Sequence, residues 1–209
     1  MTTVAIVDYG MGNLQSVKNA FEAIGAIAVI AREPAEVRDA DKIILPGVGA
    51  FGQAMAALRS RGWVEVLEDE VQQKRKPLLG LCLGMQLLAS NGTEGGALPG
   101  LGWISGIVEE LPGNADIRVP HVGWNDVTVT PHSRMYEGLG DLQAFYFVHS
   151  YVLDAYEPNI VNGVCTHGIS FVASIERGHI WATQYHPEKS QRVGLKVLTN
   201  FLTHTFAGC

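Results

Sequence analysis

The chain has 209 residues and a formal net charge of −6, and hydrophobic residues make up 47% of it. This length favours one domain, residues 1–209, with a substantial core, and the apolar fraction excludes a disordered chain. The acidic balance argues against nucleic acid and anionic membrane as partners, since each requires a basic surface. The longest unbroken apolar stretch, Ala23 to Ala31, is too short to cross a bilayer.

The N-terminal residues and the cysteines predict a cytoplasmic protein. No basic region precedes the first apolar run, and Asp8 interrupts that run, so no secretory signal is expected. Cys82, Cys165 and Cys209 form a sparse, odd set without C-x-x-C spacing. This pattern argues against a disulfide framework and a structural zinc site and favours a reducing compartment. We expect Cys165 to lie in the core and Cys209 in a frayed terminus.

The first ninety residues alternate apolar runs with helical segments. The runs at 4–7, 26–30, 43–45 and 78–81 lack alternation and predict buried parallel strands. The segments 14–24, 51–58, 64–76 and 84–89 predict helices, the first with Asn13 as N-cap and Gly25 as C-cap. The charged residues of 64–76 are interpreted as a solvated face.

After residue 90 the pattern changes to Gly- and Pro-rich stretches and short strands. Strands are expected at 124–129, 145–152, 171–175 and 179–184, the last two joined by a turn at 176–178. A final helix carries Leu195, Leu198 and Leu202. The predicted fold class is α/β: a mainly parallel central sheet with helices on both faces and added antiparallel strands.

The segment Gly80-Leu81-Cys82-Leu83-Gly84 has the form of a nucleophile elbow with cysteine as the nucleophile. A sharp strand-to-helix turn would lift the thiol above the sheet edge, and the helix N-terminus would favour thiolate. The N–H of Leu83 would point to a developing oxyanion. The alternative is a simple buried cysteine.

The segment His186-Pro187-Glu188 supplies a partner for that thiol. Proline forces the preceding residue into an extended conformation, where residues i and i+2 project to the same side. A carboxylate beside an imidazole fixes its tautomer and stabilises imidazolium, as a general base for a thiol requires. Cys82, His186 and Glu188 together predict acyl transfer from an amide or ester, although a solvated loop is the alternative for the second segment alone.

Gly47-Val48-Gly49-Ala50-Phe51-Gly52 matches the dinucleotide fingerprint G-x-G-x-x-G. The acidic residue expected about twenty positions later, at the tip of a strand, is missing. We therefore interpret these glycines as bringing backbone N–H groups close to a substrate, as a second arm of an oxyanion hole.

The elbow and the His-Pro-Glu segment resemble those of class I (triad) glutamine amidotransferases, which hydrolyse glutamine to glutamate and ammonia. Five further segments, spread over nearly the whole chain, look like those of the glutaminase subunits of imidazole glycerol phosphate synthase: residues 8–14, 46–51, 121–125, 147–151 and 186–190. The resemblance implies a flavodoxin-like glutaminase fold without metal or organic cofactor. It implies Cys82 as nucleophile, His186 as general base and acid, and Glu188 as its orienting group. It also implies that the N–H of Leu83 and an N–H of Val48 or Gly49 form the oxyanion hole.

The same resemblance implies a substrate site and a partner. Gln86 and the strand His149-Ser150-Tyr151 would hold glutamine, and Asn13, Trp124 and Lys189 would lie at the partner interface. For Trp124, core burial is the alternative, and Lys189 could equally be a surface charge. The partner would be a (β/α)₈-barrel cyclase subunit of a heterodimer, which receives ammonia for histidine biosynthesis. Because unused hydrolysis wastes glutamine, we expect the Val48 peptide to point its carbonyl into the oxyanion hole until the partner triggers a flip.

Two other classes of function stay open at this stage. One is a glutaminase for another acceptor, in anthranilate, GMP or pyridoxal phosphate synthesis. The other is a non-catalytic flavodoxin-like module that binds a dinucleotide.

Overall fold

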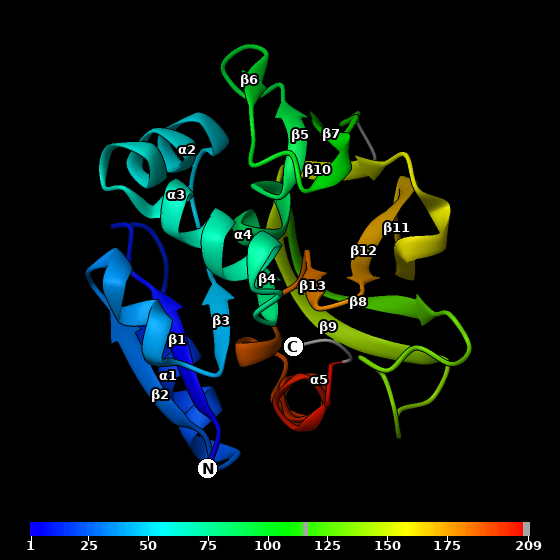
Figure 1. Cartoon of the computed structure of the whole chain (residues 1–209). Coiled ribbons are helices and arrows are strands. Elements are labelled where there is room, and N and C mark those ends of the chain that lie inside the picture. The colour runs from blue at the N-terminus through cyan, green and yellow to red at the C-terminus, as the bar shows by residue number, and fades with distance from the viewer. Residues whose placement is uncertain (115–116, 207–209) are drawn as a thin grey trace.

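The computed structural model describes residues 1–114 and 117–206. A nine-stranded sheet runs through the molecule in the order β2-β1-β3-β4-β13-β12-β11-β8-β9 (Figure 1). Its first five strands pair in parallel and the others antiparallel. In chain order the strands are β1 Thr3–Val7, β2 Ile27–Ala31, β3 Lys42–Leu45, β4 Leu78–Leu81, β8 His121–Val129, β9 Leu142–His149, β11 Val161–His167, β12 Ile169–Arg177 and β13 Ile180–Thr183.

A second sheet of four strands, in the order β10-β7-β5-β6, packs beside the first. It consists of β5 Ala89–Gly92, β6 Leu98–Pro99, β7 Ile104–Glu110 and β10 Tyr151–Ala155. The α-helices are α1 Leu14–Ala23, α2 Phe51–Ser60, α3 Trp63–Leu67, α4 Leu83–Gln86 and α5 Gln191–Thr203, with a π-helix at Glu68–Gln73 and 3₁₀ turns at Pro34–Asp39, Pro158–Ile160 and Pro187–Lys189.

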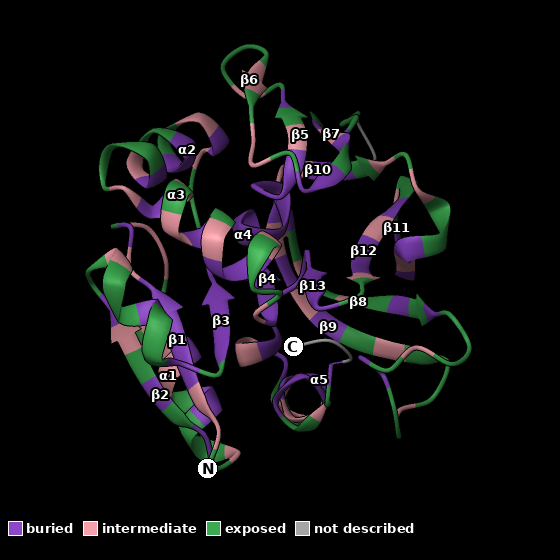
Figure 2. Ribbon diagram, viewed as in Figure 1, coloured by how far each residue is buried: buried purple, intermediate pink, exposed green. Residues whose placement is uncertain are grey.

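Strand β1 shows why the sheet is covered on both faces. Val4 and Ile6 join one buried cluster, with residues of α1 and α5. Ala5 and Val7 join the other, with residues of α2, α3 and the second sheet. Successive side chains of a strand point to opposite faces, so an apolar run without alternation buries both. Figure 2 shows the resulting band of buried residues along the central strands. The predicted α/β class with added antiparallel strands is confirmed.

Five local expectations need correction. The strand expected to be buried at 26–30 is β2, an edge strand that leaves Ile27 and Val29 exposed. The expected strand 145–152 is two strands in different sheets, because the chain bends at Ser150. The expected helix 84–89 ends at Gln86, and Ala89 already pairs in β5. Strands β5, β6, β7 and β11 were not predicted. Asn13 holds the N-cap position of α1, but its side chain makes no capping hydrogen bond.

The segment 64–76 is helical only as far as Gln73, and its charges are not all solvated. The Glu70 side chain is only 2% exposed and pairs with Lys74 and Lys76, each at 2.7 Å. Burial would raise the pKa of Glu70, but the hydrogen bonds from both lysines outweigh it and lower that pKa. No helix in the described ranges is both long and apolar enough to span a bilayer.

Candidate active site

Cys82 lies at the carboxyl end of β4 in a strained turn. Its backbone has φ +52° and ψ −110°, a conformation that L-residues rarely adopt. Helix α4 begins at the next residue, as the elbow motif predicts. Two glycines make the turn possible: a Cβ on Gly84 would lie 1.8 Å from the Leu45 carbonyl oxygen, and one on Gly80 would lie 3.0 Å from the Gly84 backbone.

His186 follows the strand next to β4. Strands β4 and β13 are parallel, with Leu81 paired to Thr183, and the Cys82 N–H donates to the Thr183 carbonyl at 2.7 Å. The carboxyl ends of adjacent parallel strands meet at one sheet edge, so residues 82 and 186 become neighbours although 104 positions separate them. The His186 N–H donates to the Tyr146 carbonyl, and the Ser190 hydroxyl donates to the His186 carbonyl.

The imidazole of His186 is buried between a thiol and a carboxylate. Its Nδ1 lies 2.8 Å from Oε1 of Glu188, and its Nε2 is buried without a hydrogen-bond partner among the described residues. Burial alone would lower the pKa of His186, but the adjacent Cys82 and Glu188 raise it to about 10. His186 is extended, as expected before proline, whereas Glu188 reaches the ring from a 3₁₀ turn rather than from an extended segment.

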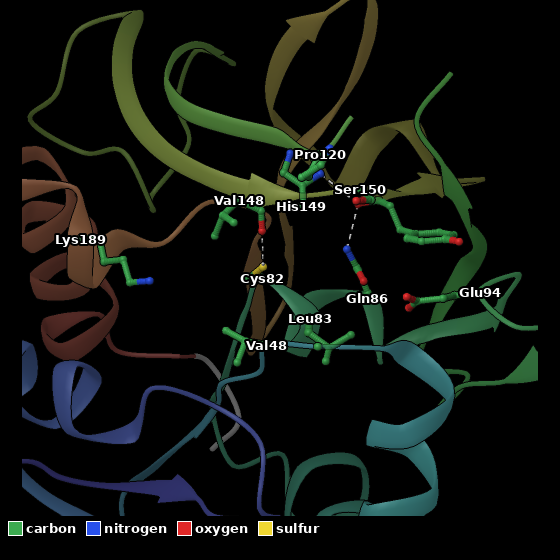
Figure 3. A pocket seen from close by; sticks show the side chains of 12 residues that line it. Val48, Cys82, Leu83, Gln86, Glu94, Pro120, Val148, His149, Ser150 and Lys189 are labelled. Atoms are coloured by element: carbon green, nitrogen blue, oxygen red, sulfur yellow. Dashed lines mark hydrogen bonds between the residues drawn. The ribbon is translucent and has the colours of Figure 1, made fainter. Parts of the chain in front are cut away.

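A cavity of about 410 Å³ opens over the Cys82 thiol (Figure 3). Cys82 is 5% exposed and its sulfur faces this space; the Val148 carbonyl lies 3.8 Å away and the Gln184 amide 3.7 Å away. Eight other residues predicted for the site line the same cavity: Val48, Gly49, Leu83, Gln86, His149, Ser150, Tyr151 and Lys189. The thiol is therefore neither far from its predicted partners nor sealed beneath aliphatic side chains.

Two residues at the site were missed in the sequence. Glu94 is the carboxylate among the residues that line the cavity, and it lies at the opposite end from Lys189 (Figure 3). Gln184 is fully buried and links Cys82 to Gln86, because its Oε1 accepts from Gln86 Nε2 at 3.0 Å. Glu94 lies in a Gly-rich stretch that carries no motif. Gln184 stands two residues before His186 in an extended segment, a position that could have suggested its orientation.

The dinucleotide interpretation of the Gly-rich turn finds no support in the geometry. The Phe51 N–H, at the start of α2, donates to Glu94 Oε2 at 2.7 Å. A carboxylate therefore occupies the helix N-terminus where a dinucleotide phosphate would bind. Val48 and Gly49 instead line the cavity over Cys82, and Gly49 has φ +108°.

The residues predicted at a partner interface are exposed or line the cavity rim. Trp124 is 50% exposed, so the core alternative is wrong, and its ring packs edge-on against Tyr146 with centroids 6.2 Å apart. Lys189 Nζ lies 5.8 Å from the same Tyr146 ring. Asn13 is exposed and precedes α1. Cys165 is buried, as expected, and Cys209 lies outside the described residues. Within those residues, no group of three or more His, Cys, Asp or Glu side chains could hold a metal ion.

Comparisons with known proteins agree with this geometry. The family model for class-I glutamine amidotransferases matches residues 5–205. The imidazole glycerol phosphate synthase subunit HisH 1 of Campylobacter jejuni (strain RM1221) is 45% identical over 199 residues, covering 95% of this chain and 98% of that protein. Subunit HisH of Moorella thermoacetica is 46% identical over 201 residues, covering 96% and 94%.

Solved structures support the fold. The structure of PurLQS from Thermotoga maritima aligns with a TM-score of 0.74 at 17% identity, covering 97% of this chain and 98% of that chain. The family resemblance of the motifs is confirmed. The chain belongs to the class-I glutamine amidotransferase family and, within it, to the HisH subunits of imidazole glycerol phosphate synthase.

Proposed function

We propose that this chain hydrolyses glutamine to glutamate and ammonia through a thioester on Cys82. The ammonia passes to a cyclase subunit that makes imidazole glycerol phosphate and AICAR in histidine biosynthesis. The observation that carries this proposal is the meeting of a thiol, an imidazole and a carboxylate at the ends of β4 and β13, beneath an open cavity.

The first half of the reaction forms the thioester. His186 takes the thiol proton at Nε2, and the sulfur attacks the side-chain carboxamide carbon of glutamine. Glu188, bound to Nδ1, orients the ring and stabilises the imidazolium. The tetrahedral intermediate collapses when His186 returns the proton to the leaving nitrogen, so that ammonia departs and a γ-glutamyl thioester remains on Cys82.

The second half releases glutamate. A water molecule enters the position that ammonia vacated, and His186 removes one of its protons as the oxygen attacks the thioester carbon. Collapse of the second intermediate breaks the carbon–sulfur bond. The proton on His186 returns to the sulfur, and the free enzyme is restored.

Gln86, His149, Ser150 and Tyr151 are proposed to hold the substrate. Their support is that all four line the cavity next to Cys82. Glu94 adds a negative charge at one end of this cavity, and a carboxylate there suits the α-ammonium group of an amino acid. We assign Glu94 to that group.

The Leu83 N–H and an N–H of Val48 or Gly49 are proposed to bind the oxyanion. Leu83 starts the helix beneath the thiol, and Val48 is 39% exposed on the cavity wall. Gly47 and Gly49 flank Val48, which leaves its peptide free to rotate. We retain the hypothesis that this peptide points its carbonyl into the hole until the partner binds.

The partner is proposed to be a (β/α)₈-barrel cyclase subunit that docks at Asn13, Trp124 and Lys189. In support, Asn13 follows the carboxyl end of β1 and Lys189 follows that of β13, so both lie at the sheet edge that carries Cys82. A dry passage across this interface would keep ammonia unprotonated and nucleophilic. We propose that the chain acts in the cytoplasm, because a reducing compartment keeps the free thiols of Cys82 and Cys165 intact. We propose neither nucleic acid nor a membrane as a partner.

Glutamine hydrolysis, measured with and without the cyclase and its nucleotide substrate, tests this function. We expect little turnover by the isolated chain, a large increase with both additions, and no turnover by Cys82→Ala. High turnover by the isolated chain would contradict the gate, and wild-type activity of Cys82→Ala would contradict the mechanism. Activation by a synthase of anthranilate, GMP or pyridoxal phosphate instead would assign another acceptor.

A further inference from the structure

A continuous chain of hydrogen bonds runs from the cavity into the antiparallel half of the large sheet. His149 Nδ1 lies 3.0 Å from the Tyr151 carbonyl, and His149 Nε2 lies 3.0 Å from His121 Nδ1. His121 Nε2 lies 3.1 Å from Asn125 Nδ2, which donates to the Thr166 carbonyl at 2.9 Å. Three strands, β9, β8 and β11, therefore contribute to one polar line.

Chemistry fixes the direction of every bond in this line. A carbonyl oxygen only accepts, so His149 Nδ1 carries a proton for Tyr151. In a neutral ring Nε2 then accepts, and His121 Nδ1 must donate to it. The same reasoning makes His121 Nε2 the acceptor of an Asn125 amide proton. The second amide proton reaches Thr166, so each ring has one determined tautomer.

The surroundings keep both rings neutral. Burial lowers the pKa of His149 to about 3 against its hydrogen bond to Tyr151, and the facing His121, His167 and His186 act in the same direction as burial. Burial, together with the stacked His167, lowers the pKa of His121 to about 4. Phe147 and Phe171 enclose the two rings and add no charge.

This chain of hydrogen bonds ends on the Tyr151 carbonyl oxygen, which also contacts Gln86 of the proposed substrate site. The Tyr151 carbonyl accepts from His149 and also from Gln86 Nε2 at 2.9 Å. One oxygen thus holds two of the proposed glutamine-binding side chains at the bend between β9 and β10 (Figure 3). Rotation of His149 would remove one of the two donors that hold this oxygen.

We propose that His121 and Asn125 are positioning residues for glutamine: they fix the tautomer of His149 and, through it, the Tyr151 carbonyl and Gln86. This inference rests on the proposed glutaminase function. Neither residue lines the cavity, and both act through His149. On strand β8 they alternate with the exposed Val122 and Trp124, so one face of the strand serves the substrate site and the other lies open.

Asn125→Asp in the complex with the cyclase tests the proposal, because it keeps the shape and removes the donor. A carboxylate accepts from His121 Nε2 instead of donating to it, so His121 either moves its one proton to Nε2 or takes up a second proton, and either change removes the neutral Nδ1 donor that His149 faces. Loss of one such hydrogen bond predicts a KM for glutamine about tenfold higher, with kcat within about twofold. Asp126→Asn, the opposite exchange at the next, exposed position, should leave both constants unchanged.

Nitrogen-15 spectra of the histidine side chains supply a second readout that a packing role would not change. In the wild-type complex, His149 should be neutral and protonated at Nδ1 between about pH 5 and 8. Asn125→Asp should shift that signature. A wild-type KM and an unchanged spectrum in Asn125→Asp would overturn the inference. A His149 protonated at Nε2 in the wild type would also overturn it, and this spectrum decides the question if Asn125→Asp does not fold. Absence of hydrolysis by the wild-type complex would instead overturn the proposed function.

Discussion

The position of the Cys82 thiol depends on a few neighbouring positions where only glycine fits. The turn at residue 82 is strained, and the backbone of β3 crosses so closely that Gly84 has no room for a side chain. Such strain persists only where the surroundings over-determine it. The strained turn therefore holds the Cys82 sulfur in a fixed position.

Gly84→Ala should disrupt the turn at Cys82 and destabilise the chain. A Cβ at 1.8 Å from the Leu45 carbonyl oxygen forces the backbones apart, and we expect a loss of at least about 3 kcal/mol in the free energy of unfolding, measured in urea. Gly52→Ala is the matched control: its Cβ would lie close only to the end of the flexible Leu98 side chain, with the Glu94 carbonyl oxygen at an ordinary 3.9 Å, and the change should stay within about 1 kcal/mol. A Gly84→Ala variant as stable as wild type would contradict the close approach.

The raised pKa of His186 predicts a pH-dependent contribution to stability. The pKa rises from 6.5 to about 10 on folding, so the folded chain binds the proton more tightly. The stabilisation is complete below about pH 6.5 and is lost as the pH rises towards 10. Glu188→Gln removes one cause of the shift. The difference in unfolding free energy between wild type and variant should be largest below about pH 6.5 and narrow towards pH 10; a difference independent of pH would contradict the ion pair.

At the scale of elements, the parallel half was predictable except for the exposure of its edge strand β2, and the second sheet was not. Residues 43–45 and 78–81 are fully buried strands, and their unbroken apolar runs indicate this directly. Strands β5 and β6 are short, contain Gly92 and Pro99, which strand propensity disfavours, and pair with each other and with β7. Propensity cannot reveal such strands, because their stability comes from the pairing itself.

The triad of Cys82, His186 and Glu188 was also only partly predictable from the sequence. Its residue types follow from two motifs, but the adjacency of residues 82 and 186 requires the pairing of β4 with β13. Glu94 enters the site through tertiary contacts alone, whereas the position of Gln184, two residues before His186, offered a local signal. The burial of Glu70 was missed for a related reason. Its i,i+4 pair with Lys74 suggests an exposed helix face, but Lys76 also pairs with the carboxylate.

Glu70→Gln should destabilise the π-helical segment. The change removes the charge from two hydrogen bonds at a buried carboxylate and should cost about 2 kcal/mol in the free energy of unfolding. Asp69→Asn removes a half-exposed partner of the same Lys74 and should cost clearly less than Glu70→Gln. Equal effects in chemical denaturation would contradict the burial of Glu70.

At the scale of the whole molecule, the cavity lies where the two sheets part. His149 ends β9 of the large sheet and Tyr151 begins β10 of the small one. Cys82 approaches from the parallel strands, and Glu94 from the small sheet's connections. The proposed substrate site thus depends on both sheets, while the proposed partner residues remain outside it or at its rim.

Trp124→Ala should weaken the complex with the cyclase without unfolding the chain. An exposed tryptophan at an interface typically anchors it, so we expect the dissociation constant to rise at least about tenfold by titration calorimetry. Tyr156→Ala, at an aromatic residue that is 61% exposed beside the second sheet, should leave binding unchanged. Equal affinities for the wild type and Trp124→Ala would place the interface elsewhere.

Covalent trapping tests the central claim most directly. The complex is incubated with a glutamine analogue that carries an electrophilic carbon in place of the carboxamide, and its peptides are analysed by mass spectrometry. We expect an adduct on the peptide that contains Cys82, with Cys165 unmodified because it does not line the cavity and burial raises its pKa to about 12, and slower labelling in His186→Asn. An adduct on Cys165 alone, or labelling of Cys82 that does not depend on His186, would contradict it.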